Sequence, residues 1–201
     1  MTTVSDDFNR ADGGLGSDWR SYASGAATGA KIASNQVGAV TPPWGGDYLV
    51  AYQTTTFGDT ADVFAQITCK ATESTDAIIG PAVRVDPTTG AAYGLWWFSG
   101  GFSLRRNGTQ VQYTATAIAV NDVLKLTCER VGSDDVLKVW LNGAQIGTTY
   151  TDTSPWSGAT MVGMQFGYPD ATGRIDDWSG GDYSAGGGSV YVPRRSMMGV
   201  G

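Results

Sequence analysis

The sequence predicts an all-β protein, a two-sheet antiparallel jelly-roll sandwich followed by an extended C-terminal tail. Short runs of alternating apolar and polar residues recur along the chain, and no stretch of helical periodicity is long enough to compete with them. The 201 residues include 29 glycines and are 11% aromatic and 16% charged, a composition typical of many short strands joined by tight turns. Two similar Asp-Asp-aromatic segments, at 6–8 and 176–178, lie near the two ends of the chain.

The predicted strands follow one another as an antiparallel meander. Asn107-Gly108 and Asn142-Gly143 each separate two alternating runs, and they mark hairpins because a type I′ turn needs a positive φ at both central residues. A turn at 132–134 joins two further strands. We expect about a dozen strands, too many for one open sheet, so two sheets should pack together. The clearest strands are residues 47–52, 62–69, 77–85, 92–98, 102–106, 109–114, 123–131, 136–141 and 144–149.

The first and last segments of the domain are expected to pair and close the sandwich. Residues 5–19 and 173–183 carry the two similar motifs and bracket the predicted strands. Phe8, Leu15 and Trp19 have the spacing of residues that plug a sandwich edge, while Asp7 and Asp12 have that of turn caps. Residues 1–183 should therefore form a single domain, long enough to bury a substantial core.

Both cysteines are predicted to face the core. Val63 and Ile67 lie on the same side of their strand as Cys69, and Leu126 lies on the same side as Cys128. We predict two buried free thiols, with a cross-strand disulfide as the alternative.

Charge and hydropathy argue against two classes of partner. The net charge of -6 disfavours nucleic acid, because a phosphate-binding surface needs a concentrated positive field. No run approaches the roughly 18 consecutive apolar residues of a membrane span, and the first residues do not resemble a signal peptide. We therefore expect neither nucleic acid nor membrane as a partner, and we expect synthesis in a cytoplasm.

The last 18 residues differ in composition from the domain. Residues 184–189 have a Gly/Ser linker composition. The tail carries a charge of +2 and no acid, whereas the rest of the chain has 11 basic and 19 acidic groups and a charge of -8. We expect the tail to anchor the protein by adding a strand to another subunit's sheet edge, with methionines in an apolar groove and arginines at an acidic rim. Docking on its own domain is the alternative. The expected anchoring residues are Val190, Tyr191, Val192, Arg194, Arg195, Met197 and Met198.

The aromatic strand at 93–98 is the best evidence for a binding surface. Alternation sends Tyr93, Leu95 and Trp97 to one side and Trp96 and Phe98 to the other. Only one side of a sandwich strand meets the core, so loops, a partner or a ligand must cover the second side.

Polar residues on neighbouring strands extend that second side. Alternation places Arg84 and Arg105 on the side opposite Val83 and Leu104. Such a face would suit a sugar, because aromatic rings stack on a pyranose while planar polar groups bind its hydroxyls. A contact between subunits is an equal alternative. The expected face comprises Arg84, Trp96, Phe98, Arg105 and Gln165.

The closing strands also suggest a structural calcium site. Pairing of the two ends would bring Asp6 or Asp7 close to Asp176 or Asp177, and hard cations need clustered oxygens. The alternative is that these acids cap turns and lie at the edge of the sandwich.

Several motifs together resemble a known family. Asp6-Asp-Phe-Asn-Arg-Ala-Asp-Gly-Gly-Leu-Gly-Ser-Asp-Trp19, Gly80-Pro-Ala-Val-Arg-Val-Asp86 with Ala92-Tyr-Gly-Leu-Trp-Trp97, and Val139-Trp-Leu-Asn-Gly143 are similar to the laminin G-like, concanavalin A-like β-sandwich. More narrowly, residues 4–183 resemble domains of tail and other virion proteins of phages that infect actinobacteria. The resemblance implies the fold, and calcium is common in that fold.

Catalysis is not expected. Glucanases of this fold carry a Glu-x-Asp-x-x-Glu strand, but Glu73 and Glu129 lie in separate segments here. Adjacent pairs such as Asp134-Asp135 point to opposite sides of a strand, and the chain has no histidine to serve as a general base.

The resemblance implies a virion structural protein displayed on the particle exterior. A minor tail protein that contacts host cell-wall glycan is the first interpretation, with other virion proteins and copies of itself as partners. A capsid decoration protein, a stand-alone carbohydrate-binding module and, last, a glycoside hydrolase are the alternatives.

Overall fold

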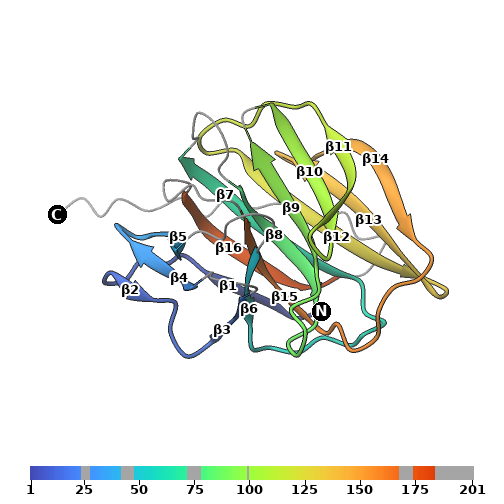
Figure 1. Ribbon diagram of the computed structural model, residues 1–201, viewed down its shortest axis with the longest axis horizontal. Coiled ribbons are helices and arrows are strands. Elements are labelled where there is room, and N and C mark those ends of the chain that lie inside the picture. The colour runs from blue at the N-terminus through green and yellow to red at the C-terminus, as the bar shows by residue number, and fades with distance from the viewer. Residues whose placement is uncertain (24–27, 42–47, 72–77, 99, 168–173, 184–201) are drawn as a thin grey trace.

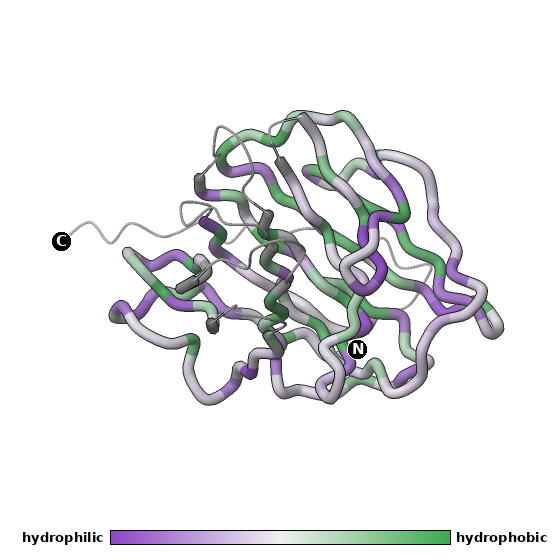
Figure 2. The backbone as a smooth tube through the Cα atoms, in the orientation of Figure 1, coloured by the Kyte–Doolittle hydropathy of each residue, from purple (hydrophilic) through white to green (hydrophobic). Residues whose placement is uncertain are grey.

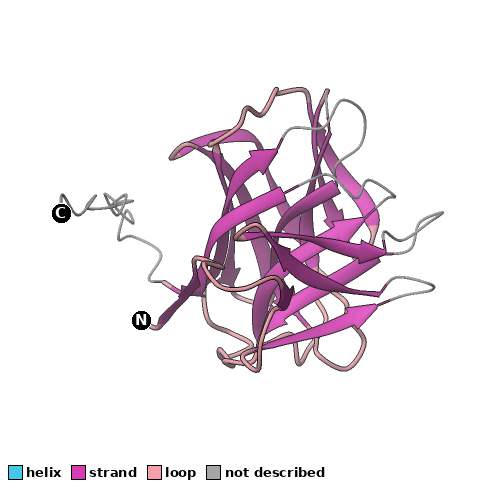
Figure 3. Ribbon diagram, turned by 90° about the vertical axis from the view of Figure 1, so that its left-hand side faces the viewer, coloured by secondary structure: helices cyan, strands magenta, loops and turns pink. Residues whose placement is uncertain are grey.

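Strands make up all the regular structure that the computed structural model describes, and they form two antiparallel sheets stacked face to face (Figure 3). The described residues are 1–23, 28–41, 48–71, 78–98, 100–167 and 174–183. They include no helix that is long and apolar enough to cross a membrane. The predicted all-β, two-sheet antiparallel sandwich is therefore confirmed.

One sheet has nine strands and contains both ends of the domain (Figure 1). β1 pairs with β16 beside the main path of this sheet. In spatial order the path runs β14 (Ala144–Asp152), β13 (Asp134–Leu141), β12 (Val123–Val131), β7 (Val63–Ala71), β16 (Arg174–Asp182), β5 (Gln36–Thr41), β4 (Thr28–Ala33) and β2 (Gly13–Gly14), and β1 is Thr3–Asp6.

The second sheet has seven strands and carries the aromatic strand near its centre. Its spatial order is β11 (Thr109–Thr114), β10 (Gly101–Arg106), β9 (Tyr93–Phe98), β8 (Ile78–Val85), β15 (Met161–Gly167), β6 (Tyr48–Gln53) and β3 (Trp19–Ala23).

The Asn-Gly hairpins form as predicted. Asn107 and Gly108 have φ values of 47° and 79°, and Asn142 and Gly143 have 51° and 83°, the positive values that a type I′ turn requires. These turns connect β10 to β11 and β13 to β14, and they set the pairing register at the hairpin ends.

The first and last described strands pair and close the sandwich, as the sequence predicts. β1 lies antiparallel to β16 with Asp6 opposite Trp178. Phe8, Trp19 and Trp178 are buried together, and the rings of Trp19 and Trp178 meet edge to face with centroids 4.8 Å apart. This aromatic cluster is buried beside the β1–β16 pair.

The main core lies between the sheets, and the apolar stretches follow the strands while hydrophilic residues gather at many of the turns (Figure 2). Cys69 and Cys128 are buried in this core as free thiols, which confirms the prediction. Burial raises the pKa of Cys128 to about 12, so this thiol stays protonated and acts as a small apolar side chain.

The C-terminal tail, including Val190–Val192, Arg194, Arg195, Met197 and Met198, lies outside the described residues. Its anchoring role stays a prediction.

Candidate functional site

Strand β9 separates its aromatic residues between two environments. Tyr93, Leu95 and Trp97 point into the main core, whereas Trp96 points to the outer side of the seven-stranded sheet. The predicted division of this strand is thus confirmed for these four residues. The side chain of Phe98 lies outside the described part of the structure.

Arg105 stacks on Trp96 on this outer side. The guanidinium carbon lies 3.9 Å from the centre of the Trp96 ring, a cation–π contact between neighbouring strands. Arg105 Nε donates to Ser103 Oγ at 3.1 Å, and Nη1 donates to the Gly108 carbonyl at 2.7 Å. Desolvation by burial lowers the pKa of Arg105.

Gln165 brings a buried amide to the same surface. It lies on β15 between the inward-facing Met164 and Phe166, and its side chain is 0% exposed. Within the described residues, neither its amide oxygen nor its amide nitrogen has a hydrogen-bond partner, and Nε1 of the 3% exposed Trp96 has none either. Buried polar groups in native proteins are nearly always hydrogen-bonded, so an unpaired amide and an unpaired indole on one side of the sheet require an explanation.

Small residues line the sheet beneath this amide. Gly80, Ala82, Gly94 and Gly163 occupy adjacent positions on β8, β9 and β15. A β-carbon at Gly94 would collide with the Gln165 amide oxygen, so the glycine gives the amide its place. These small residues leave room for Gln165 to reach across β8 to Gly94 of β9.

The β8–β9 connection covers one half of the outer face. Gly90 lies against the ring of Tyr22, and the Tyr52 hydroxyl donates to the Pro87 carbonyl at 3.5 Å. A second small apolar cluster, with Val50 and Ala92, is buried there. On the other half, towards β10 and β11, Trp96 and Ser103 are also buried, whereas Arg105 is half-buried and Tyr113 is exposed.

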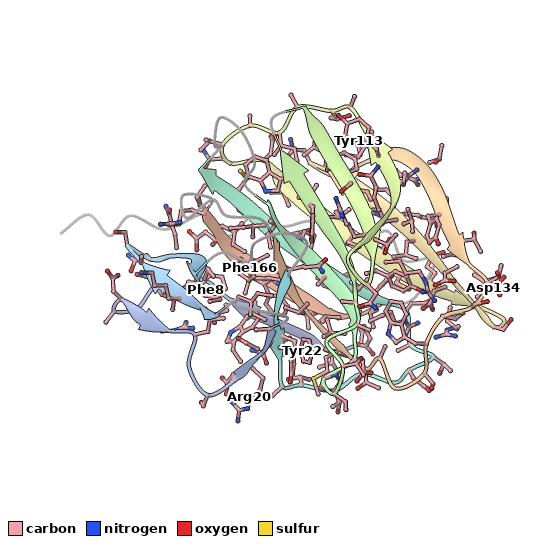
Figure 4. The ribbon with its side chains drawn as sticks, in the orientation of Figure 1. Phe8, Arg20, Tyr22, Tyr113, Asp134 and Phe166 are labelled. Carbon is pink, nitrogen blue, oxygen red and sulfur yellow. The ribbon has the colours of Figure 1, made fainter. Side chains whose placement is uncertain are left out.

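Tyr113 is the accessible aromatic residue of that half, and the sequence interpretation missed it. It lies on β11 opposite Ser103 and is 47% exposed, and its hydroxyl donates to the Gly100 carbonyl at 2.8 Å. Figure 4 shows Tyr113 and Arg20 at opposite edges of the sheet. Simple counting from the Asn107-Gly108 turn would place Gln112 opposite Ser103, but a register shift between Leu104 and Arg105 moves Tyr113 there.

Arg84 does not belong to this face, contrary to the prediction from alternation. A register shift in the β8–β15 pairing and a φ of 53° at Arg84 turn its side chain into the space between the sheets. It is 1% exposed there, with Nη2 3.3 Å from Asp135 Oδ1 and Nη1 2.7 Å from the Asp59 carbonyl.

A second arginine, Arg130, contacts the Asp135 carboxylate. Arg130 Nε lies 3.0 Å from the same Asp135 oxygen, although neither contact of Asp135 has hydrogen-bond geometry. Arg130 also lines a depression of about 340 Å³ at this end of the sandwich, together with Trp156 and several hydroxyl residues. Its remaining nitrogens donate to the carbonyls of Ser133 and Asp59, so they serve the fold.

The acids of the closing strands do not assemble a calcium site. Asp6 accepts hydrogen bonds from Arg10 at 2.6 and 2.9 Å and from Trp19 Nε1 at 2.8 Å, so both of its oxygens are engaged. Asp176 lies 3.8 Å from Lys70, while Asp7 caps the Asn9 amide. The described residues contain no group of three or more carboxylate, cysteine or histidine side chains placed to hold a metal ion. The predicted set of Asp6, Asp7, Asp176 and Asp177 therefore does not fit calcium, because an arginine already neutralises Asp6.

Solved structures share this two-sheet arrangement. A protein of unknown function from Shewanella oneidensis MR-1 has a TM-score of 0.53 and 16% identity, over 89% of this chain and 84% of that one. The acidic lectin of winged bean, complexed with methyl-alpha-D-galactose, has a TM-score of 0.51 and 12% identity, over 89% and 98%. The protein has the concanavalin A-like β-sandwich fold. Carbohydrate-binding module CBM66 from Bacillus subtilis adds a TM-score of 0.50 and 16% identity, over 80% and 91%.

The comparisons for this concanavalin A-like sandwich are limited to structure. No protein-family model matches the sequence, and no curated protein matches it.

The two glutamates of the chain are Glu73 and Glu129. Within the described residues, Glu129 accepts hydrogen bonds from Lys138 at 2.8 Å and from the Tyr183 hydroxyl at 3.4 Å. Glu73 lies outside the described residues.

Proposed function

We propose that this protein is a non-enzymatic glycan-binding protein that contacts its ligand through the outer face of the seven-stranded sheet. We call this surface the Trp96 face and define it as Trp96, Ser103, Arg105, Tyr113 and Gln165. The observation on which this proposal rests is that the fully buried amide of Gln165 and the indole nitrogen of Trp96, on the same side of the sheet, both lack hydrogen-bond partners among the described residues. Leaving such groups unpaired costs about 1–3 kcal/mol each, which selection for folding alone would remove.

A sugar matches the chemistry of this face. Its hydroxyls both donate and accept, which is what an amide and an indole N–H require, and the apolar side of its ring packs on an aromatic side chain such as Tyr113. Tyr113 and Arg105 are the accessible members, so a ligand meets them first. Reaching Gln165 then requires the side chains above it to move. The sugar complex of the winged bean lectin and the carbohydrate-binding role named for CBM66 support the same assignment.

The proposal includes a location for this activity. The sequence resemblance to actinobacteriophage virion proteins supports a minor tail protein displayed on the particle exterior, which contacts host cell-wall glycan. The tail, including Tyr191 and Arg194, anchors it to other virion proteins, and several copies assemble together.

A capsid decoration protein that stabilises the shell is the second candidate. The observation that favours it is the closed state of the Trp96 face, where Trp96 is 3% and Gln165 0% exposed. A decoration protein needs a rigid sandwich and an anchor but no accessible site.

The test is glycan binding by the full chain across a panel of bacterial cell-wall glycans. We expect Tyr113→Ala and Gln165→Met each to lower the affinity about tenfold or more. Val131→Ala is the matched control, because Val131 is also an exposed apolar residue but lies on β12 of the other sheet. Binding that neither face variant changes would overturn the assignment of the site. No binding to any glycan, with loss of particle incorporation on deletion of 190–201, would favour decoration.

A further inference from the structure

The charges of the two sheets differ sharply. The seven-stranded sheet contains no aspartate or glutamate in its strands, although the chain has 19 acids. The same strands carry four arginines, which are Arg20, Arg84, Arg105 and Arg106. An acidic protein thus has one sheet whose strands are formally cationic.

Two of these arginines are neutralised from the opposite sheet. Arg84 lies 3.3 Å from Asp135 of β13, and Arg106 lies 2.5 Å from Asp152 of β14. Arg10 and Arg130 outside this sheet also have carboxylates, at 2.6 and 3.0 Å. All four arginines are paired with carboxylates, and the pairing matters most for Arg84, whose side chain is 1% exposed, because burying an unpaired charge is unfavourable.

Arg105 is the exception to this pairing of arginines with carboxylates. It is half-buried on the Trp96 ring, and it donates hydrogen bonds to a hydroxyl and a carbonyl. Among the described residues Nη2 has no hydrogen-bond partner, and no carboxylate lies within ion-pair distance of the guanidinium. A partly desolvated cation without a carboxylate is a site at which an anion gains free energy by binding.

The neighbouring polar atoms favour the same kind of ligand. Trp96 Nε1 can only donate, and Gln165 Nε2 provides two further N–H groups, all of them unpaired. With the Arg105 guanidinium, the Trp96 face therefore has more free donors than acceptors. An oxyanion supplies the acceptors that these donors lack.

We infer that the ligand of the Trp96 face is an acidic glycan, whose carboxylate or phosphate ester lies against the Arg105 guanidinium while a sugar ring packs on Tyr113. This inference rests on the proposed function and adds the charge of the ligand to it. Ser103 lies opposite Tyr113, and Arg105 lies two residues farther along β10, so one or two sugar units span both contacts.

The experiment compares ligands that share their sugars and differ in whether they carry an anionic group. Trigalacturonate and its fully methyl-esterified form share the same sugars, and galactose 1-phosphate against galactose provides the phosphate arm. Calorimetric titration of the full chain should show the acidic probe of at least one pair binding about tenfold more tightly than its neutral partner. Preference in only one pair identifies the anion as carboxylate or phosphate.

Arg105→Gln should bring the affinities for the acidic and the neutral probe together, while Arg105→Lys retains part of the preference. Arg20→Gln is the matched control, because it removes the same charge from the opposite edge of the same sheet (Figure 4) and should leave the preference within about twofold. Thermal melting of each variant establishes that it is folded.

The experiment distinguishes failure of the acidic-glycan inference from failure of the proposed function. Equal binding of acidic and neutral probes to the wild type, lost in Tyr113→Ala, overturns the acidic class and leaves the proposed function standing. Absence of binding to every glycan in both this experiment and the panel overturns both. A preference that Arg105→Gln leaves intact overturns the role of Arg105.

Discussion

The amide oxygen of Gln165 occupies the space in which a β-carbon at Gly94 would lie. Two strands that are not hydrogen-bonded neighbours, β15 and β9, are thereby fitted together on the outer side of the sheet, across β8. Among the described residues this amide has no hydrogen-bond partner, and neither has the indole nitrogen of Trp96 on the same side of the sheet. A polar group held so closely and left unpaired has an effect on stability that can be measured separately from its effect on binding.

Gln165→Met is expected to stabilise the fold and weaken binding. Methionine has a similar length and volume, and it removes an unpaired buried amide whose burial costs about 1–3 kcal/mol. Chemical denaturation should therefore show a free energy of unfolding raised by up to that amount, while glycan titration shows lost affinity. A clear decrease in stability would mean that the amide has a hydrogen-bond partner in solution. The proposed function would then lose the observation on which it rests.

Gly94→Ala tests the same relationship from the other strand. The added methyl group displaces the Gln165 amide without removing it, and Gln165 is flexible enough to turn away. We expect a modest destabilisation of about 1–3 kcal/mol, typical of overpacking, and a loss of glycan affinity comparable with that of Gln165→Met. In the double variant with Gln165→Met, the loss of affinity should be less than additive, because both changes act on one group. Additive losses would contradict this coupling.

The interior arginines provide a stability prediction that is independent of binding. Asp135 is 1% exposed and lies within 3.3 Å of both Arg84 and Arg130. Asp135→Asn leaves the buried Arg84 and the 17% exposed Arg130 without this carboxylate, so the free energy of unfolding should fall by about 3–5 kcal/mol.

Glu129→Gln is the matched control for that variant. It breaks the Lys138–Glu129 pair, whose side chains are 26% and 19% exposed, and should lower the free energy of unfolding by about 1 kcal/mol or less. Equal effects of Asp135→Asn and Glu129→Gln in urea denaturation would show that burial does not govern these pairs.

Arg105 lies on the predicted face and Arg84 does not, which shows which features of the fold and site the sequence can predict. Local signals predicted the Asn-Gly hairpins, the pairing of the two ends and the alternation of the aromatic strand, because each depends on a few neighbouring residues. Arg84 and Tyr113 were misplaced or missed because a register shift in each pairing changes which residues share a side, and alternation cannot anticipate a bulge. Strands β4 and β5, rich in small residues, lacked a clear apolar pattern and were not singled out.

The hydrogen bonds of Asp6 and Asp152 could not be predicted from local patterns alone. Trp19 and Arg106, which donate to them, lie 13 and 46 residues away along the chain. The sequence suggested calcium for Asp6, whereas the structure pairs it with Arg10, four residues away, and with the Trp19 indole. The Arg10 pair is local, but the bonds from Trp19 and Arg106 depend on long-range packing.

Acid should destabilise the protein through Asp152. Burial alone would raise the pKa of Asp152, but hydrogen bonds from Arg106, Tyr93 and the Ser154 amide together hold it below its ordinary value of 3.8. A carboxyl whose pKa is lower in the folded state stabilises the fold above its unfolded pKa, and this stabilisation is lost as pH falls through the folded value. Melting temperature should therefore fall below about pH 4.

Asp152→Asn isolates this group within the acid transition. The variant should melt at a lower temperature near neutral pH, because the charge-assisted hydrogen bonds from Arg106 and Tyr93 are weakened. Its melting temperature should then change less between about pH 4 and about pH 2 than that of the wild type. An unchanged slope would show that other carboxyls, such as Asp6, dominate acid unfolding.

Chelation should leave the described domain unaffected, whereas removal of the Asp6 charge should not. Asp6 holds Arg10, the Trp19 indole and the Phe8 amide at the point where the sandwich closes, with no metal ion required for these contacts. We expect EDTA to leave the melting temperature within about 1 °C. Asp6→Asn should lower the free energy of unfolding by about 1.5–3 kcal/mol, as expected for charge-assisted hydrogen bonds to a part-buried group. A large decrease in melting temperature with EDTA, restored by added calcium, would contradict this account of the closing strands, because it would require the acids there to bind a cation in place of Arg10.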